Sequence, residues 1–153
     1  MNRQGILIVV SGFSGAGKGT IMKALTGRYE GYALSVSATT RSPRPGEDEG
    51  KAYFFKSVEE FEQMIAEGAL IEYARYVSNY YGTPRSYVEE QLAAGHDVIL
   101  EIEIQGARKI KEQYPDAVLL FVTTNDAQTL KDRLTGRGTE SEEVIRNRLL
   151  RAA

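Results

Sequence analysis

Residues 6–20 read ILIVVSGFSGAGKGT, an apolar run followed by a glycine-rich segment that contains one lysine. The spacing G-x-x-x-x-G-K, from Gly12 to Lys18, is typical of a phosphate-binding loop between a buried strand and a helix. Glycines permit positive φ angles and close backbone approach, and backbone N–H groups at the helix start bind phosphate oxygens. Lys18 would add a mobile positive charge at the β- and γ-phosphates. The stretch therefore predicts a nucleotide-binding α/β fold.

The loop departs from the strict motif at one position. Gly19 follows the lysine where Ser or Thr would serve as a magnesium ligand, and Thr20 comes one residue later. We expect magnesium to be held mainly through water and nucleotide oxygens. Phe13 is interpreted as a packing residue. An ordinary glycine-rich turn between strand and helix is the alternative, but it would not require a lysine at this position.

Composition limits the classes of function. The 153 residues are 42% hydrophobic and carry a net charge of −2, which suits one globular domain and gives no general attraction to nucleic acid. There are no cysteines, so disulfides and thiolate chemistry are excluded. The apolar runs are too short to cross a bilayer, and the N-terminus lacks a signal-peptide pattern. We expect a cytoplasmic protein with neither nucleic-acid nor membrane partners.

Short apolar strands alternate with amphipathic helices over much of the chain. The expected pairs are 6–10 with a helix from about Lys18, 97–104 with 107–114, and 117–122 with 126–134. This alternation predicts a parallel sheet covered by helices. Residues 34–95 break the rhythm: strands are expected at 34–39, 51–55 and 69–77, with helices beginning at the capping box Ser57-x-x-Glu60 and near residue 86. The sequence thus predicts a core (1–33 and 96–125), an inserted lobe (34–95) and a segment at 126–150.

A second candidate anion site lies in SATTRSPRPGE, residues 37–47. Arg41 and Arg44 stand three residues apart, in a segment that Pro43 and Pro45 keep out of helical conformation. Two guanidinium groups on a stiff loop suit bidentate phosphate contacts. A solvated basic loop explains this segment equally well. Tyr53, Tyr80 and Tyr81 carry hydroxyls that would complete such a clamp, although tyrosines more often pack.

Five segments taken together resemble guanylate kinase, a nucleoside monophosphate kinase of the P-loop family. They are SGFSGAGKGT, SATTRSPRPGE with KAYFF, LIEYARYVSNYYGT, ILEIEIQGA and RLTGRGTESEEVIRNRL, in the family's order and spacing. The resemblance covers essentially the whole chain. It implies a P-loop three-layer fold with a GMP-binding lobe at 34–95, a lid at 126–150, and phosphoryl transfer from MgATP to GMP.

The resemblance also assigns residues to each substrate. It implies ATP binding by Gly12, Phe13, Ser14, Gly15, Ala16, Gly17, Lys18, Gly19, Thr20 and Arg133. It implies GMP binding by Ser37, Arg41, Arg44, Tyr53, Glu72, Tyr81, Thr83, Glu101 and Glu103. The catalytic residues it implies are Lys18, Arg41, Arg137 and Arg148, of which the last two would act at the transferring phosphate. The chemistry supports Glu72, because guanine offers two adjacent donors that one carboxylate accepts together.

Glu101 and Glu103 are expected on one face of the strand at 97–104, since residues two apart point the same way. Carboxylates there would orient magnesium water or a substrate hydroxyl, whereas an ion-paired strand end is the alternative. The family often has aspartate at these positions, which leaves the division of roles open.

The resemblance further implies a C-terminal strand and helix that the sequence does not contain, so that one edge of the sheet would be uncovered. Two other functions stay open: a non-catalytic guanylate-kinase-like interaction module, and a kinase for another nucleoside monophosphate. The intact loop argues against the first. Glu72 with Thr83 argues against the second.

Overall fold

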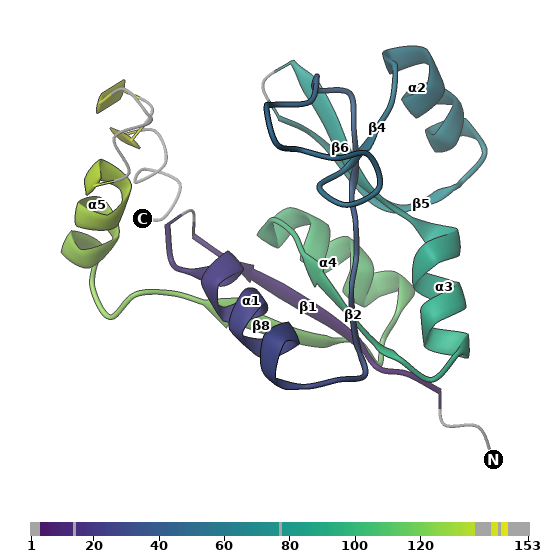
Figure 1. Ribbon diagram of the computed structural model, residues 1–153, viewed down its shortest axis with the longest axis horizontal. Coiled ribbons are helices and arrows are strands. Elements are labelled where there is room, and N and C mark those ends of the chain that lie inside the picture. Colours follow the sequence, from purple (N-terminus) through teal and green to yellow (C-terminus); the bar gives the residue numbers. More distant parts are fainter. Residues whose placement is uncertain (1–3, 14, 77, 137–141, 144, 147–153) are drawn as a thin grey trace.

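The computed structural model describes residues 4–13, 15–76, 78–136, 142–143 and 145–146 (Figure 1). One sheet contains β1 (Leu7–Gly12), β2 (Tyr32–Leu34), β7 (Asp97–Glu101) and β8 (Val118–Val122). A second sheet contains β3 (Ala38–Thr39), β4 (Phe54–Phe55), β5 (Leu70–Tyr76) and β6 (Asn79–Pro84). The helices are α1 (Lys18–Arg28), α2 (Val58–Ala66), α3 (Arg85–Ala93), α4 (Ile104–Gln113) and α5 (Ala127–Gly136).

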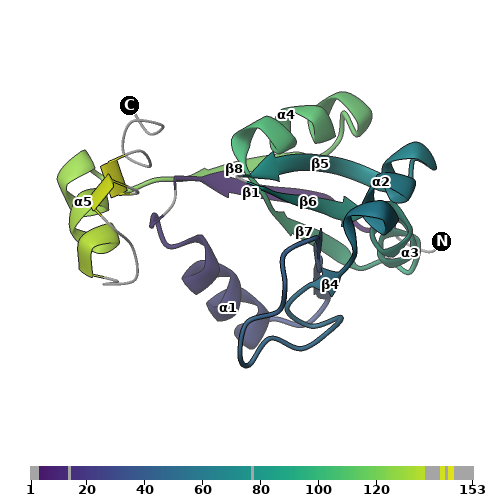
Figure 2. The ribbon, with the colours of Figure 1, turned by 90° about the horizontal axis from the view of Figure 1, so that it is seen from above.

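The first sheet is parallel, in the order β2-β7-β1-β8. Alternate residues of its central strands enter different cores. Val9 and Leu100 pack with α3 and α4, whereas Val10 and Ile99 pack with Met22 of α1. Figure 2 shows α1 on one side of the sheet and α4 on the other. This arrangement confirms the predicted parallel sheet covered by helices. The prediction succeeded because strands that are buried on both faces have continuous apolar sequences.

The second sheet is mixed, in the order β4-β3-β6-β5, with β3 parallel to β4 and antiparallel to β6. Helix α2 packs on it through Phe61, which is fully buried and stacks on Tyr80 with ring centroids 5.1 Å apart. The predicted capping box starts α2: Ser57 Oγ accepts from the Glu60 N–H, and the Glu60 carboxylate accepts from the Ser57 N–H. Tyr80 is thus a packing residue of this sheet.

The edge strand β8 is unusually apolar for its exposure. Val118, Leu119, Leu120 and Phe121 are each between 39% and 50% exposed. Among the described residues, no strand pairs with the outer side of β8. Within the same part of the chain, none of the helices combines the length and apolar character that crossing a membrane requires.

Several predicted strands have the wrong bounds, and one strand is absent from the prediction. Strand β4, for example, covers only Phe54–Phe55 of the expected 51–55. The run at 34–39 is divided between the sheets: β2 ends at Leu34 and β3 begins at Ala38, because the chain crosses from one sheet to the other between them. The strand at 97–104 ends at Glu101, and α4 already begins at Ile104. Strand β6 was not predicted, since NYYGTP has the composition of a turn.

Candidate functional site

The glycine loop between β1 and α1 has the backbone that the sequence predicts. Gly12, Gly15 and Gly17 have φ angles of 147°, 86° and 103°. A Cβ at Gly12 would lie 2.0 Å from the Val122 carbonyl oxygen of β8, so the close approach of the two strands also requires glycine there. Gly17 is the N-cap of α1, and the first turn of this helix contains no acidic side chain. The helix start therefore presents free N–H groups and a partial positive charge to an anion.

The Lys18 side chain folds back over this loop. Its ammonium group donates to the carbonyl oxygens of Gly12, at 2.8 Å, and Phe13, at 3.3 Å. These two acceptors hold the charge beside the loop backbone, where a phosphate group would bind. Both hydrogen bonds have a charged donor, and a bound anion would give the ammonium group a charged acceptor as well.

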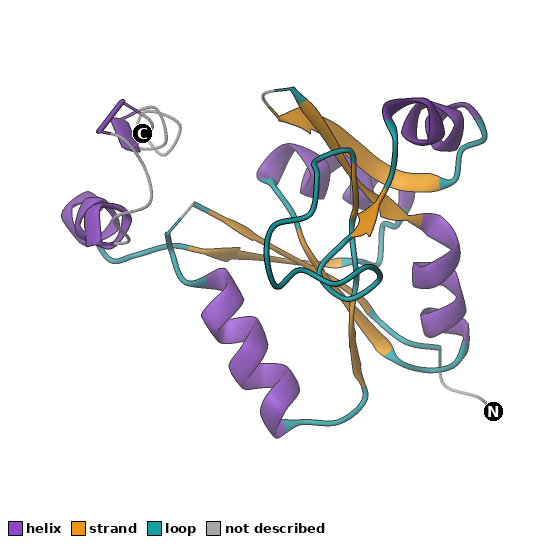
Figure 3. Cartoon of the chain, turned by 45° about the horizontal axis from the view of Figure 1, so that its top comes forward, coloured by secondary structure: helices purple, strands orange, loops and turns teal. Residues whose placement is uncertain are grey.

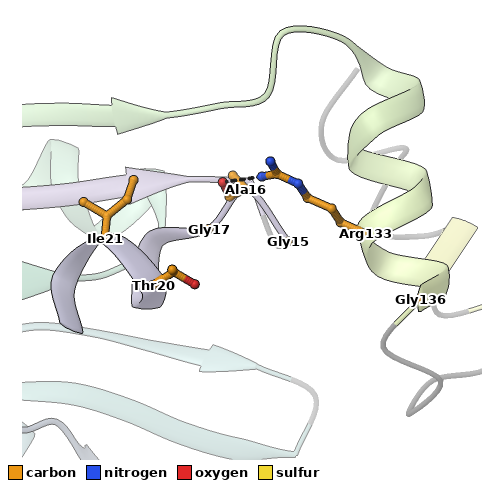
Figure 4. A pocket seen from close by; sticks show the side chains of 7 residues that line it. All are labelled: Gly15, Ala16, Gly17, Thr20, Ile21, Arg133 and Gly136. Carbon is orange, nitrogen blue, oxygen red and sulfur yellow. Dashed lines mark hydrogen bonds between the residues drawn. The ribbon is translucent and has the colours of Figure 1, made fainter. Parts of the chain in front are cut away.

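Helix α5 contributes one cation to the same place. Arg133 Nη1 donates to the Ala16 carbonyl oxygen at 3.0 Å, across 117 positions of the sequence. Figure 4 shows Arg133 reaching from α5 toward the loop, with Thr20 and Ile21 of α1 on the other side of the pocket. This pocket has a volume of about 590 Å³ and is lined by Gly15, Ala16, Gly17, Thr20, Ile21, Arg133 and Gly136. Four of the predicted loop residues, Gly15, Ala16, Gly17 and Thr20, therefore line this pocket together with the predicted Arg133.

Phe13 packs, as the sequence interpretation proposed. Its ring lies against Leu130 and Leu134 of α5 and meets Phe121 edge-on, with centroids 5.1 Å apart. The exposed Gly19 belongs to the first turn of α1. Three predicted site residues lie outside the described residues: Ser14, Arg137 and Arg148.

The second predicted anion site forms a connected group on the second sheet. The Arg41 guanidinium lies 5.3 Å from the centre of the Tyr53 ring, and the Tyr53 and Tyr81 rings meet at 6.1 Å. Arg41 Nη2 also forms an ion pair with Glu47 Oε1 at 3.0 Å. Of the four predicted phosphate-clamp residues, Arg41 therefore contacts Tyr53, and Tyr53 contacts Tyr81. Arg41 already binds a carboxylate.

Glu47 was not singled out by the sequence analysis, although it ends the quoted motif. One carboxylate oxygen binds Arg41, and the other accepts from the backbone N–H of Arg44 at 2.8 Å. The turn that joins Arg44 to Glu47 has Pro45 and Gly46 at its centre, with Gly46 at a φ of 86°. The hydrogen bond from Arg41, followed by that from Arg44, holds the pKa of Glu47 below its usual value. The exposed Arg44 is thus placed by its backbone.

The predicted guanine readers lie on neighbouring strands. Glu72 of β5 and Thr83 of β6 are register partners, 7% and 1% exposed, and the Thr83 hydroxyl donates to Glu72 Oε1 at 2.7 Å. Burial raises the pKa of Glu72, while the Thr83 hydrogen bond and the charge of Lys109 oppose that rise. Ala38 pairs with Gly82, so extending this register by one residue brings the half-buried Ser37 opposite Thr83. Within the described part of the chain, a buried carboxylate is therefore held by a hydrogen bond to Oε1, while its Oε2 has none.

The expectation that Glu101 and Glu103 share a strand face is wrong. Glu101 is the last residue of β7, and Glu103 is the N-cap of α4. Glu101 is opposite Val10, and the Ile102 N–H still donates to the Val10 carbonyl oxygen. The chain then leaves the sheet to start α4, whereas β1 continues beside β8 to Gly12. Both residues are exposed, and Glu101 lies opposite Val10, two residues before the first glycine of the loop. In the part of the chain that the structure describes, no group of three or more His, Cys, Asp or Glu side chains is placed to hold a metal ion.

Comparison with known proteins agrees with this geometry. The guanylate kinase family model matches residues 4–153. The chain belongs to the guanylate kinase family. It is similar to the guanylate kinase of Streptococcus thermophilus strain CNRZ 1066, with 54% identity over 99% of this chain and 73% of that protein. The guanylate kinase of Oceanobacillus iheyensis is 52% identical over 99% of this chain and 74% of its own length.

A solved structure shows that the similarity extends from the sequence to the fold. The crystal structure of guanylate kinase from Anaplasma phagocytophilum matches with a TM-score of 0.71 and 33% identity, over 90% of this chain and 70% of that one. The guanylate kinase family thus accounts for the parallel sheet and for the mixed second sheet. In this chain, the glycine loop and the Glu72–Thr83 pair belong to different sheets.

Proposed function

We infer that this member of the guanylate kinase family transfers the terminal phosphoryl group of ATP to GMP, giving ADP and GDP, and we propose a role for each part of the site. The observation that carries the proposal is the buried Glu72–Thr83 pair, which offers a free carboxylate oxygen away from the glycine loop. One nucleotide is then held by its phosphates at the loop. The other is held by its base at the second sheet.

The glycine loop is proposed to bind ATP. Residues 12–20 would surround the β- and γ-phosphates with backbone N–H groups, with Lys18 as the mobile cation. Arg133, which already reaches the Ala16 carbonyl oxygen, would add a second positive charge from α5. Arg137 and Arg148 are proposed to neutralise the charge on the transferring phosphoryl group.

GMP is proposed to bind on the second sheet. The ionised Glu72 carboxylate would accept from guanine N1–H and the exocyclic amine, whereas adenine presents a lone pair at N1 and would be repelled. Ser37 and Thr83 would contribute hydroxyl groups beside it. The GMP phosphate would bind Arg41, Arg44, Tyr53 and Tyr81. Because Arg41 now binds the Glu47 carboxylate, an arriving phosphate would meet a guanidinium that is already oriented for an anion.

Magnesium is proposed to accompany ATP. Glu101 and Glu103 suit it, since both are exposed carboxylates at the end of β7, beside the strand that enters the glycine loop. They would hold the ion through water, and the ion would offset the negative charge of the phosphates. The phosphate of GMP is itself the nucleophile, so this chain's residues need only orient and neutralise.

The two substrates are proposed to be brought together by movement of parts of the chain. Residues 1–33 and 96–125 would form the core, residues 34–95 the GMP-binding lobe and residues 126–150 the lid. Figure 3 shows α5 standing apart from the second sheet, at the end of the connection that follows β8. Closure would align the donor and acceptor phosphates.

The test is ADP release from MgATP with GMP, AMP, CMP, UMP or dTMP supplied separately, together with calorimetric GMP binding. Turnover with GMP alone is expected. Turnover with another nucleotide in its place would contradict the assignment of Glu72 and Thr83. Clear GMP binding without turnover would instead favour a non-catalytic guanylate-kinase-like interaction module.

A further inference from the structure

Helix α4 contains a glycine at a position where helices rarely benefit from one. Gly106 is the third residue of α4, is buried, and has an ordinary helical backbone with no positive φ angle. Alanine would therefore be favoured here on helix propensity, and no turn or strained backbone requires glycine. The reason for a glycine at this position is found in the atoms that a larger side chain would contact.

A Cβ built on Gly106 would lie 2.9 Å from Glu72 Oε2 and 3.2 Å from the Ile102 Cδ1 atom. Real Cβ atoms almost never approach an oxygen so closely, so the Glu72 carboxylate would have to move. The second carboxylate oxygen, Oε2, thus lies against the space that a side chain at Gly106 would need. The first oxygen, Oε1, is the one bound by Thr83.

Hydrogen bonds and core packing hold strand β5 beside α4 and α3, which opposes any movement of β5 that would relieve such a contact. The Gln113 side-chain amide of α4 donates to the Ile71 carbonyl oxygen at 2.8 Å, and Arg85 Nη2 donates to the Leu70 carbonyl oxygen at 3.2 Å. Ile71 is 1% exposed and belongs to the main core cluster with Ala107 and Ile110 of α4. The backbone on both sides is fixed, whereas the end of the Glu72 side chain can rotate. A methyl group at Gly106 would therefore displace the carboxylate and leave the fold in place.

The position of Gly106 also suits an anion. It lies in the first turn of α4, whose N–H groups have no acceptor within the helix, and the partial positive charge there favours an ionised carboxylate. Without a side chain at Gly106, Glu72 Oε2 can lie beside this turn of the helix. The glycine thus provides both the room and the electrostatic environment.

We propose that Gly106 is a positioning residue that sets guanine selectivity: its lack of a side chain lets the Glu72 carboxylate lie against α4 in the orientation that accepts both guanine donors. This role rests on the proposed function, because it assumes that Glu72 reads guanine. Gly106 itself touches no substrate and acts through Glu72.

The test compares Gly106→Ala with a matched control, Gly27→Ala. Gly27 is an exposed glycine in α1, and a Cβ there would meet nothing within 4 Å. GMP and AMP binding are measured by calorimetry, kcat and KM by ADP release, and folding by the thermal unfolding midpoint. For Gly106→Ala we expect GMP binding at least tenfold weaker, a matching rise in the KM for GMP, an unchanged KM for ATP, and a midpoint no lower than that of the unaltered protein. Gly27→Ala should leave nucleotide binding, kcat and KM within twofold of the unaltered protein, and the thermal unfolding midpoint within a degree or two.

A double-mutant cycle separates this role from a general effect on the site. Glu72→Asp shortens the side chain by one methylene and draws the carboxylate back from the Gly106 position. Adding Gly106→Ala to Glu72→Asp should therefore weaken GMP binding by less than threefold. An equal loss in both backgrounds would overturn the proposal, as would GMP binding unaffected by Gly106→Ala, or a midpoint that falls by several degrees. If the unaltered protein binds no GMP, both the proposed function and the proposed role of Gly106 are wrong. If GMP binding is lost in Glu72→Gln but kept in Gly106→Ala, only the proposed role of Gly106 is wrong.

Discussion

Thr83→Val is the substitution that most directly tests how the guanine site works. Valine has nearly the shape of threonine but cannot donate the 2.7 Å hydrogen bond to Glu72 Oε1. Both side chains are buried, at 1% and 7% exposure, so water cannot easily replace the lost donor. A hydrogen bond to a charged group contributes about 1.5–3 kcal/mol. The variant carboxyl group would relieve this loss by rotating or by taking up a proton.

Both relief processes have to be reversed when guanine binds, because guanine needs an ionised and oriented carboxylate. The lost free energy therefore appears as weaker GMP binding, by roughly 10- to 150-fold at neutral pH. Thr83→Ser is the matched control, since serine retains the hydroxyl group and should bind GMP within a few-fold of the unaltered protein.

The pH dependence gives a second signature of the same prediction. Burial raises the pKa of Glu72, and the Thr83 hydrogen bond opposes that rise. GMP binding is expected to be lost as pH falls through this pKa, and removing the hydrogen bond raises the pKa further. The acid loss of GMP affinity should therefore move to higher pH in Thr83→Val but not in Thr83→Ser. Calorimetry between pH 5 and 9 tests this, and equal GMP affinity of the two variants at every pH would refute the reasoning.

The remaining predictions concern the glycine loop, the arginine loop and the stability cost of the site. Lys18→Ala should lower kcat by about 10²–10³-fold with GMP binding unchanged, because it removes one preorganised charge at the transferring phosphate; Lys23→Ala on the same helix is the control, and normal turnover in Lys18→Ala would exclude the loop from catalysis. Arg41→Ala should raise the KM for GMP by about 10- to 100-fold through the loss of charge-assisted hydrogen bonds, whereas Lys51→Ala, 81% exposed in the same segment, should not; an unchanged KM in both would mean that this loop is merely solvated. Glu72→Gln should lose GMP binding, yet its stability relative to the unaltered protein should increase as pH rises. The pKa of Glu72 is raised in the folded state, so its contribution to the stability of the unaltered protein is fully present below the unfolded-state pKa and is lost as pH rises through the folded-state pKa. Urea unfolding at several pH values measures the last effect, and a constant difference from pH 4 to pH 8 would contradict it.

The sequence predicts those features that depend on local pattern. The strand, glycine loop and helix around Lys18 follow from glycine spacing and apolar periodicity, and the start of α2 follows from the capping box at Ser57. Continuous apolar runs indicate the parallel sheet because its central strands, β1 and β7, are buried on both faces. Each of these signals lies within about twenty residues of chain.

Features that depend on partners distant in sequence could not be predicted in this way. Strand β6 contains a glycine and a proline and becomes a strand only because β5 and β3 pair with it on both sides. Glu103 falls outside β7 because it is the N-cap of α4, which begins at Ile104. The burial of Glu72 likewise follows from α4 and β6, so residues 70–74 alone leave open whether it faces solvent.

The site and the fold make opposite demands on Glu72. Burying a carboxylate in an apolar site disfavours its charged form, and one hydrogen bond from Thr83 compensates only in part. If Glu72 binds guanine as proposed, the same burial would exclude water, so that the hydrogen bonds to guanine would be stronger and the wrong base would leave a buried charge unpaired. Under the proposed role of Glu72, selectivity for guanine would lower the stability of the fold locally. The hydrogen bonds from Gln113 and Arg85 to the backbone of β5 would still keep Glu72 in position. Substitutions that loosen these two backbone contacts should consequently impair base selectivity before they impair folding.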